Sequence, residues 1–198
     1  THGQQDAFTR LAATLLLTMR GSVCLYQGEE LGLTEAELAF EDLVDPYGIE
    51  FWPQFKGRDG CRTPMVWQSS AHLASFTTAP RSWLPVPSDH LTRAVDLQLA
   101  DPASVLNYYK AMLAFRRQHP ALVKGTIELL DLQDGVLGFI RRHGQEELLC
   151  VFNMREIGMV VELPEGLAVH NMDSPVSTAG PVGGSLSLAP FGAYIGSL

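Results

Sequence analysis

The spacing of hydrophobic residues changes along the chain, from a helical period near the start to alternation in the last third. Between residues 6 and 19, apolar side chains recur every three or four positions, which predicts an amphipathic helix. Its apolar positions are Phe8, Leu11, Ala12, Leu15, Leu16 and Met19. Ala13 and Leu17 add apolar surface on other sides, so we expect the helix to be buried on more than one face.

A short apolar run, Ser22 to Tyr26, follows this helix and ends at Gln27-Gly28. Such a run predicts a fully buried strand of the parallel type. A parallel strand needs neighbours, and the sequence contains no second run of this kind. We therefore expect its partner strands to lie in residues absent from this chain, which resembles the tail of a larger protein.

Residues 34 to 100 are rich in proline and glycine, and we expect mostly loop with short helical turns, one of them over Glu35–Leu43. A loop of this length within a compact protein usually carries function. Asp101 and Pro102 then match the N-cap and the first position of a further helix, which Pro120 ends.

From Thr126 onward apolar and polar residues alternate, which predicts strands joined by tight turns at Asp134-Gly135 and His143-Gly144. The expected strands are Ile127–Leu132, Val136–Arg142, Glu147–Phe152, Met159–Leu163, Ser185–Leu188 and Ala193–Ile195. Together they predict an antiparallel β-domain built as a two-sheet sandwich.

Composition and charge exclude several classes of protein. The 198 residues carry 22 acidic and 14 basic side chains, a net charge of −8, which gives no electrostatic reason to bind nucleic acid or an anionic membrane. The longest apolar stretch, around residues 11 to 17, is shorter than the roughly 20 residues that cross a bilayer. The three cysteines are widely spaced, and the six histidines lack metal-ligand spacing. We expect reduced thiols, a cytoplasmic location, and no metal or other cofactor.

Glu29 and Glu30 follow the predicted parallel strand at its carboxyl end, where α/β barrels place their active sites. A pair of carboxylates is typical of glycosidases, which use a general acid and a nucleophile. Neighbouring residues in an extended chain point to opposite faces, however, so these two cannot flank one bond. We favour the interpretation that one carboxylate binds loop amides while the other is solvated.

Residues 56 to 65 combine charge with glycine, and two interpretations are open. Arg58 and Arg62 could donate to sugar hydroxyls or to a carboxylate, or Arg–Asp pairs could lock the loop against its scaffold. Nearby aromatic rings could stack on a sugar or form a small core of the loop, which is the commoner outcome. These aromatic residues are Phe51, Trp52 and Phe55.

Three stretches carry a resemblance that covers essentially the whole chain. They are LYQGEELGLTEAE from Leu25, FEDLVDPYGIEFWPQFKGRDGCRTPMVWQ from Phe40, and SVLNYYKAMLAFRRQHPAL from Ser104. Together they resemble the end of the barrel in bacterial α-glucosidases of glycoside hydrolase family 13, the α-amylase family. GRDGCRTPM is the specific part, whereas YQGEELG is shared more widely among α-amylase relatives.

The resemblance implies the fold and the activity. Residues 1–122 would be the closing segment of a (β/α)8 TIM barrel with the long loop after its eighth strand, and residues 123–198 an antiparallel β-sandwich C-terminal domain. The parent enzyme would hydrolyse, with or without transfer, terminal α-linked glucose from short oligosaccharides by a retaining mechanism. The family's nucleophilic Asp, acid/base Glu and third Asp belong to motifs that are absent here. This chain alone would therefore be inactive, with the N-terminal part of the same enzyme as its partner.

Few site residues carry over from the family. Arg58 resembles the arginine that approaches the sugar on its aglycone side. Support near the site would come from Gln27, Glu29, Glu30, Asp59 and Arg62. Two alternatives stay open, a non-catalytic β-domain module for structure or sugar binding, and a related family transferase such as a sucrose isomerase.

Overall fold

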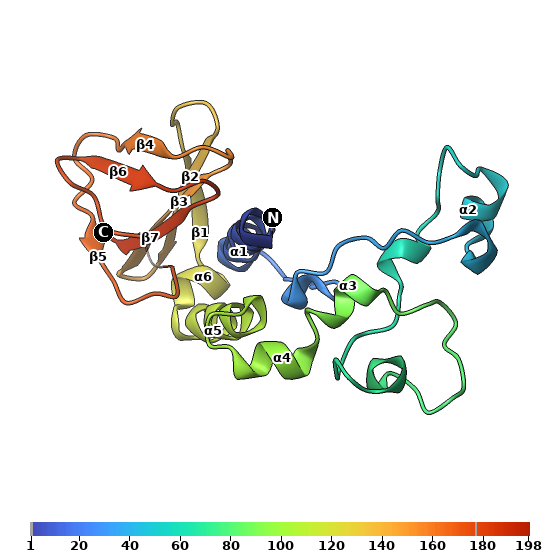
Figure 1. Ribbon diagram of the computed structural model, residues 1–198. Coiled ribbons are helices and arrows are strands. Elements are labelled where there is room, and N and C mark those ends of the chain that lie inside the picture. The colour runs from blue at the N-terminus through green and yellow to red at the C-terminus, as the bar shows by residue number, and fades with distance from the viewer. Residues whose placement is uncertain (1, 177) are drawn as a thin grey trace. The chain divides into compact units, whose positions relative to one another are not determined.

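Helices lie in the first two thirds of the chain and strands in the last third (Figure 1). The computed structural model describes residues 2–176 and 178–198, so Thr1, where the first predicted domain begins, lies outside the described residues. The α-helices are α1 (His2–Thr18), α2 (Pro46–Glu50), α3 (Ser88–Leu91), α4 (Val95–Ala100), α5 (Val105–Gln118) and α6 (Pro120–Lys124). The strands are β1 (Thr126–Leu130), β2 (Val136–His143), β3 (Glu146–Asn153), β4 (Met159–Glu162), β5 (His170–Asn171), β6 (Ser185–Leu188) and β7 (Ala193–Ser197).

The chain divides into two compact units. The first joins the residues up to Cys24 to Tyr108–Leu198, and the second is Leu25–Asn107. Helix α5 begins in the second unit and continues in the first. This division follows contacts within the chain, whereas the domain boundary between residues 122 and 123 stays a prediction.

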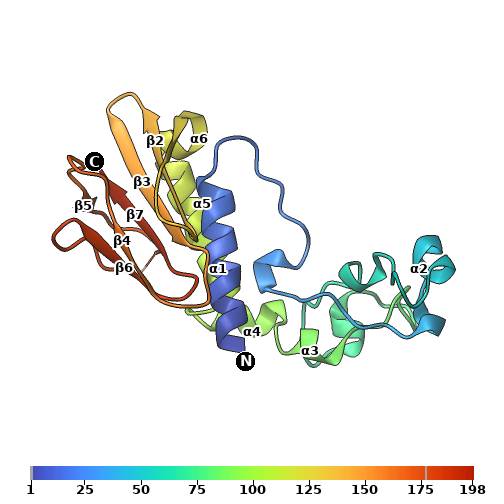
Figure 2. The same cartoon turned by 90° about the horizontal axis from the view of Figure 1, so that it is seen from above.

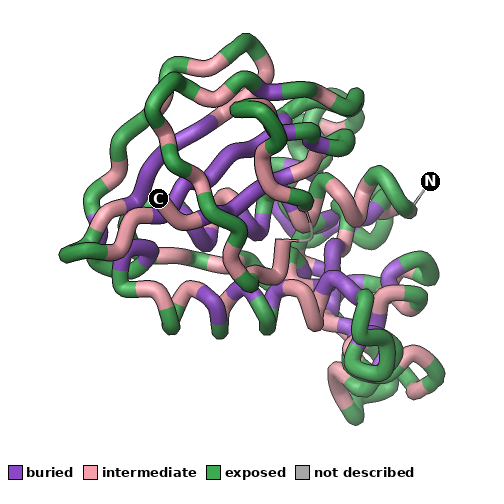
Figure 3. The backbone as a smooth tube through the Cα atoms, turned by 90° about the vertical axis from the view of Figure 1, so that its left-hand side faces the viewer, coloured by how far each residue is buried: buried purple, intermediate pink, exposed green. Residues whose placement is uncertain are grey.

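The strands of the first unit form two antiparallel sheets, one of five strands in the order β1-β2-β3-β7-β5 and one of β4 and β6. Buried side chains from both sheets share one core, made of Ile140, Leu149, Val151, Val161, Leu186, Leu188 and Tyr194. In Figure 3 the buried stretches of this unit follow the strands. The alternating pattern predicted these strands to within two residues at each end, but it missed β5, whose two residues are too few to show a period.

Helix α1 lies beside α5 and against the larger sheet (Figures 1 and 2). Leu11 and Leu17 are buried, and the ring of Phe8 meets that of Phe191 edge-on with centroids 5.4 Å apart. The β-rich region late in the sequence therefore covers part of the apolar surface of the first helix.

Two arginines bind the C-terminal end of α1, where the last carbonyl groups of a helix lack partners within it. Arg116 of α5 donates to the carbonyls of Leu17, Met19 and Gly21. The fully buried Arg141 of β2 donates to the carbonyls of Thr18, Gly125 and Thr126. A cation is also favoured at this negative end of the helix dipole. Helix α5 and the β-rich region thus both hold the end of α1 through charged hydrogen bonds, and the β-rich region adds apolar contacts.

The predicted parallel strand over Ser22 to Tyr26 does not form in the structure. Cys24 is exposed, Tyr26 is 46% exposed, and no strand among residues 2–176 and 178–198 pairs with this segment. A strand exists only within a hydrogen-bonded ladder, and every ladder among the described residues is antiparallel and joins other segments. Without a neighbour, the apolar run is a connecting segment.

The start of α5 also differs from the prediction. Asp101 Oδ1 accepts from the amide of Ala103 at 2.8 Å, in a turn that precedes the helix. The hydroxyl of Ser104 accepts from the amide of Asn107 at 3.2 Å, so Ser104 is the N-cap residue. The Asp-Pro pair therefore caps a turn here and not the helix.

Two further boundaries depend on prolines and on local turns. Pro120 ends α5 as expected, and it also begins α6 at the first helical position. Within the predicted turn Glu35–Leu43, only Phe40–Asp42 is helical, as a 3₁₀ turn. The structure thus contains short helical elements in this region, as predicted. Their bounds depend on tertiary contacts, which the hydrophobic pattern of the sequence does not show.

Replacing Arg141 with methionine should destabilise the first unit by about 3 kcal/mol, because three carbonyls lose a buried charged donor. Arg142→Met is the matched control, since Arg142 pairs at the surface with Glu128 and Glu147 and should lose about 1 kcal/mol or less. Urea unfolding followed by circular dichroism measures both losses. Equal losses for the two variants would show that Arg141 does not hold α1.

Candidate functional site

The segment after α1 that carries the two glutamates folds as a tight turn, here called the glutamate turn (residues 28–32). Gly28 and Gly32 have φ values of 92° and 65° and flank the 3₁₀ turn Glu29–Leu31. The amide of Leu33 donates back to the carbonyl of Gly28 at 2.9 Å and closes the turn. Residues that carry a side chain rarely adopt a positive φ, so the two glycines make this turn conformation possible.

Both the side chain and the backbone carbonyl of Leu31 hold the glutamate turn in place. Its fully buried side chain packs in a small core with Val66, Ala74 and Ala94. Its carbonyl accepts from Arg93 Nη1 at 3.2 Å and from Gln98 Nε2 at 2.9 Å. The backbone that carries both glutamates is therefore held at its centre.

The two glutamates have different surroundings, as the sequence predicted. Glu30 Oε2 accepts from the amide of Gly28 at 2.8 Å, whereas Glu29 is exposed. Gln27 donates from Nε2 to the carbonyl of Thr63 at 3.3 Å. Glu30 thus stabilises its own turn, and Gln27 ties that turn to residues that follow the arginines.

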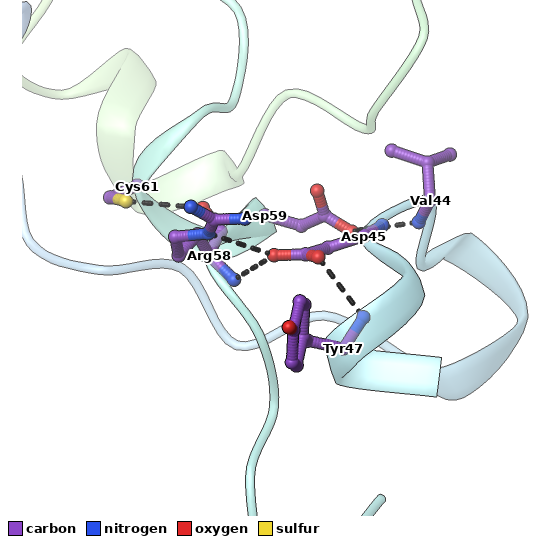
Figure 4. A network of polar contacts seen from close by, with 6 residues as sticks. All are labelled: Val44, Asp45, Tyr47, Arg58, Asp59 and Cys61. Atoms are coloured by element: carbon purple, nitrogen blue, oxygen red, sulfur yellow. Dashed lines mark hydrogen bonds and ion pairs between the residues drawn. The ribbon is translucent and has the colours of Figure 1, made fainter. Parts of the chain in front are cut away.

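Two buried aspartates organise residues 44–62, here called the charged loop (Figure 4). Asp59 Oδ2 accepts from the amides of Val44 and Asp45, both at 2.7 Å. Asp45 Oδ1 accepts from the amide of Tyr47 at 3.1 Å and caps α2, which begins at Pro46. Each buried carboxylate is satisfied by backbone donors, which offsets the cost of burying its charge.

Arg58 contacts the Asp45 carboxylate twice (Figure 4). Its backbone amide lies 2.9 Å and its Nε 3.2 Å from Asp45 Oδ2. The Arg58 side chain is 58% exposed, and that of Asp45 only 1%. Within the part of the chain that the structure describes, the Nη groups of Arg58 have no hydrogen-bond partner. One edge of the guanidinium is therefore fixed and the other is open to solvent.

The charge of Asp45 depends on these hydrogen bonds. Burial by itself raises the pKa of a carboxyl, because it disfavours the charged form. Hydrogen bonds from the Arg58 side chain and from the amides of Arg58 and Tyr47 outweigh burial, so the pKa of Asp45 lies below its ordinary value. The bond to Arg58 is therefore charge-assisted at neutral pH.

Gly48 and Gly57 let two segments of the charged loop pack backbone against backbone. A Cβ at Gly57 would lie 2.9 Å from Gly48 Cα, and Gly57 has a φ of 76°. A Cβ at Gly48 would lie 2.6 Å from the carbonyl oxygen of Lys56. Both positions therefore need glycine for the backbone contact that brings Asp45 beside Arg58.

Arg62 and Cys61 close the charged loop. The amide of Arg62 donates to the carbonyl of Asp59 at 2.9 Å, and its own carbonyl accepts from Trp83 Nε1 at 3.1 Å. The exposed thiol of Cys61 donates to the carbonyl of Arg58 at 3.1 Å. Arg62 is thus tied into the loop through its backbone.

The nearby aromatic residues divide between the two interpretations. Trp52 packs on Phe40 with ring centroids 5.8 Å apart, which is the local core expected of such a loop. Phe51 and Phe55 are 51% and 48% exposed. Phe51 also stacks on Tyr47 with ring centroids 6.1 Å apart. The core interpretation therefore holds for Trp52, whereas Phe51 and Phe55 keep accessible rings.

A cavity of about 190 Å³ lies between the glutamate turn and the end of the charged loop. From the predicted residues it brings together Gln27 and Glu29, whereas Glu30, Arg58, Asp59 and Arg62 do not line it. Its lining includes Gly60, Cys61, Thr63 and the buried His90. The sequence did not single out His90, because nothing in its own segment shows that the fold brings it to Thr63, 27 residues away.

His90 is held in one orientation by its two ring nitrogens. Nε2 lies 2.9 Å from the carbonyl oxygen of Thr34, and Nδ1 lies 3.5 Å from Thr63 Oγ1. A carbonyl oxygen can only accept, so Nε2 carries a proton. His90 thus joins the segment after the glutamate turn to the segment after the charged loop.

The cysteines, the possible metal ligands and the helices bear on three features: a disulfide, a metal site and a membrane span. Cys24, Cys61 and Cys150 are free, and burial raises the pKa of Cys150 to about 12. Residues 2–176 and 178–198 contain no group of three or more His, Cys, Asp or Glu side chains that could hold a metal ion. No helix in these ranges combines the length and the apolar character that spanning a membrane requires.

Comparison with known proteins assigns the chain to a family. The family described as "Alpha amylase, catalytic domain" matches residues 2–125. The chain belongs to the α-amylase family. The resemblance to glycoside hydrolase family 13 is thereby confirmed, and the matched residues include the glutamate turn and the charged loop.

Two relatives show how similar this α-amylase-family chain is in sequence to glucosidases. It is 55% identical over 159 residues to a probable α-glucosidase of Rhizobium meliloti. This match covers 80% of the chain and 28% of that protein. It is 34% identical over 190 residues to an oligo-1,6-glucosidase of Parageobacillus thermoglucosidasius, covering 85% of the chain and 33% of that protein.

Solved structures of the α-amylase family have the same local fold. The α-glucosyl transfer enzyme XgtA is 46% identical with a TM-score of 0.91, over 97% of this chain and 36% of that one. Trehalulose synthase MutB from Pseudomonas mesoacidophila MX-45 is 28% identical with a TM-score of 0.84, over 98% of this chain and 38% of that one. The chain therefore spans about a third of the length of the relatives it matches.

The lowered pKa of Asp45 predicts a loss of stability in acid. A carboxyl whose pKa is lower in the folded chain contributes stability above its ordinary pKa of 3.8, and this contribution is lost as the pH falls through the folded value. Between about pH 5 and pH 2, the melting temperature of the unaltered chain should therefore fall more than that of Asp45→Asn.

Asp42→Asn is the control for this measurement, because Asp42 is an exposed acid in the same region. Its melting temperature should follow that of the unaltered chain at each pH. Parallel curves for the unaltered chain and Asp45→Asn would mean that the Asp45 carboxylate contributes nothing to stability.

Proposed function

We propose that the chain forms one wall of the active site of an α-glucosidase. Residues 1–122 are then the last segment of the catalytic (β/α)8 barrel, with the long loop after its eighth strand, and residues 123–198 are a C-terminal antiparallel β-sandwich. The names of its relatives, probable α-glucosidase and oligo-1,6-glucosidase, support this activity. The substrate is a terminal α-linked glucose of a short oligosaccharide.

The reaction is the retaining two-step hydrolysis, with or without transfer of the glucose. In that mechanism one carboxylate attacks the anomeric carbon, and a second carboxyl protonates the departing oxygen and later activates water. The motifs that hold these groups in the family do not occur in this sequence. The N-terminal part of the same enzyme supplies them in our proposal, and no cofactor takes part.

Arg58 is the substrate-binding residue of the proposal. The observation that carries this role is its half-open guanidinium, fixed through Nε to a buried carboxylate and exposed at its Nη edge. Two neighbouring N–H donors in a plane match adjacent sugar hydroxyls. Loop support comes from Gln27, Glu29, Glu30, Asp59 and Arg62.

A transferase of the same family is the second candidate. Similarity to XgtA, an α-glucosyl transfer enzyme, and to trehalulose synthase MutB favours it. Separation of the products formed from maltose and from sucrose distinguishes hydrolysis from transfer or isomerisation. The non-catalytic module gains no support from the relatives, and the cytoplasmic location stays a prediction.

Purified alone, the chain should release no p-nitrophenol from p-nitrophenyl α-glucoside above the rate in buffer. Without the nucleophile and the acid, the covalent route is lost. Addition of the N-terminal part of the enzyme should restore turnover. Turnover by the chain alone that disappears in Glu29→Gln or Glu30→Gln would overturn the proposal and assign catalysis to the glutamate turn.

In the complete enzyme, Arg58→Ala should lower kcat/KM. The loss of transition-state stabilisation should be about 1–3 kcal/mol, the value of a charged hydrogen bond to the sugar. The melting temperature should change little. Lys56→Ala is the control, because Lys56 is a nearby exposed cation that pairs with Glu37 at the surface. Unchanged kcat/KM together with a loss of several degrees in melting temperature would mean that Arg58 only staples the loop.

A further inference from the structure

We propose that Asp45 is a positioning residue for sugar recognition. Its buried carboxylate holds the Arg58 guanidinium in one orientation, with the Nη edge free to bind the substrate. This role rests on the proposed function, because it requires Arg58 to contact the sugar.

The contact geometry separates this pair from an ordinary surface salt bridge. A single oxygen, Asp45 Oδ2, receives both the backbone amide of Arg58 at 2.9 Å and its side-chain Nε at 3.2 Å. The backbone amide and the guanidinium of Arg58 are thus both held by one oxygen atom. An exposed arginine otherwise samples many rotamers, and ordering them on binding reduces affinity.

The use of Nε leaves the functional edge of the guanidinium free. A carboxylate that binds an arginine bidentately through its terminal nitrogens consumes the paired donors that a ligand would use. Here the carboxylate takes Nε, and Nη1 and Nη2 have no partner within the described residues. The side chain is 58% exposed, so these donors are accessible.

Asp45 is itself fixed by its surroundings. Its other oxygen accepts from the amide of Tyr47 at 3.1 Å, and its own amide donates to Asp59 Oδ2 at 2.7 Å. Its side chain is 1% exposed and lies beside Gly57, where an added Cβ would collide with the backbone of Gly48. A carboxylate held on both oxygens and at its backbone can transmit a fixed orientation to Arg58.

A double-mutant cycle in the complete enzyme tests this role with Asp45→Asn, Arg58→Ala and the double variant. Asp45→Asn should lower kcat/KM about tenfold, mainly through KM, since binding geometry is disturbed while the chemical groups stay intact. In the Arg58→Ala background the same change should have no further effect on kcat/KM, because its target is gone. Asp42→Asn, an exposed acid nearby, should leave kcat/KM unchanged.

The outcomes separate this role from the proposed function. If Arg58→Ala leaves kcat/KM unchanged, Arg58 does not bind the sugar, and both ideas fail. If Arg58→Ala lowers kcat/KM while Asp45→Asn is silent, or lowers it equally in both backgrounds, the sugar-binding role of Arg58 stands and the positioning role of Asp45 is wrong.

A second measurement uses the 198-residue chain itself and does not depend on activity. The Arg58 Nε–H resonance should exchange slowly with solvent in the unaltered chain and rapidly in Asp45→Asn, with the Tyr47 amide as a monitor of loop folding. Rapid exchange of Arg58 Nε–H in the unaltered chain, with the Tyr47 amide protected, would contradict the proposed role.

Discussion

Buried charge is the constraint on which both units of this protein depend. The guanidinium of Arg141 lies fully inside the first unit and binds the carbonyls of Thr18, Gly125 and Thr126. A cation withdrawn from water is tolerated only when it is well hydrogen-bonded, so this contact can form only if α1 and the β-rich region meet in one arrangement. Arg116 adds three more bonds to the same helix end. Thr18 and Arg141, which are 123 positions apart, are thereby joined.

The second unit also depends on buried charge, but its buried groups are negative. Asp45 and Asp59 are buried carboxylates, and the donors that satisfy them are backbone amides and Arg58. Because few regular elements occur in this part of the chain, such bonds take the place of a ladder or a long helix. The loop therefore has a defined shape although its sequence is rich in proline and glycine.

The proposed function assigns binding to this chain and catalysis to another part of the enzyme. The described residues include an accessible guanidinium, that of Arg58, and a small cavity beside the glutamate turn, whereas the family's catalytic motifs do not occur in the sequence. Loops placed on a rigid scaffold commonly carry specificity, while chemistry is assigned to a few carboxylates elsewhere. The relatives are named as glucosidases and as an α-glucosyl transfer enzyme.

The sequence by itself determined the elements that depend on local pattern. Helix α1, the end of α5 at Pro120 and six of the seven strands among the described residues follow from period and from turn residues. The GRDGCRTPM stretch identified the family. Tertiary structure decided what depends on distant partners. Ser22 to Tyr26 has strand character but no ladder, Ser104 and not Asp101 caps α5, and Asp45 and His90 gain their roles from residues far along the chain. Hydrogen bonds between distant residues leave no periodic trace in a sequence, because they are set by how the chain returns on itself.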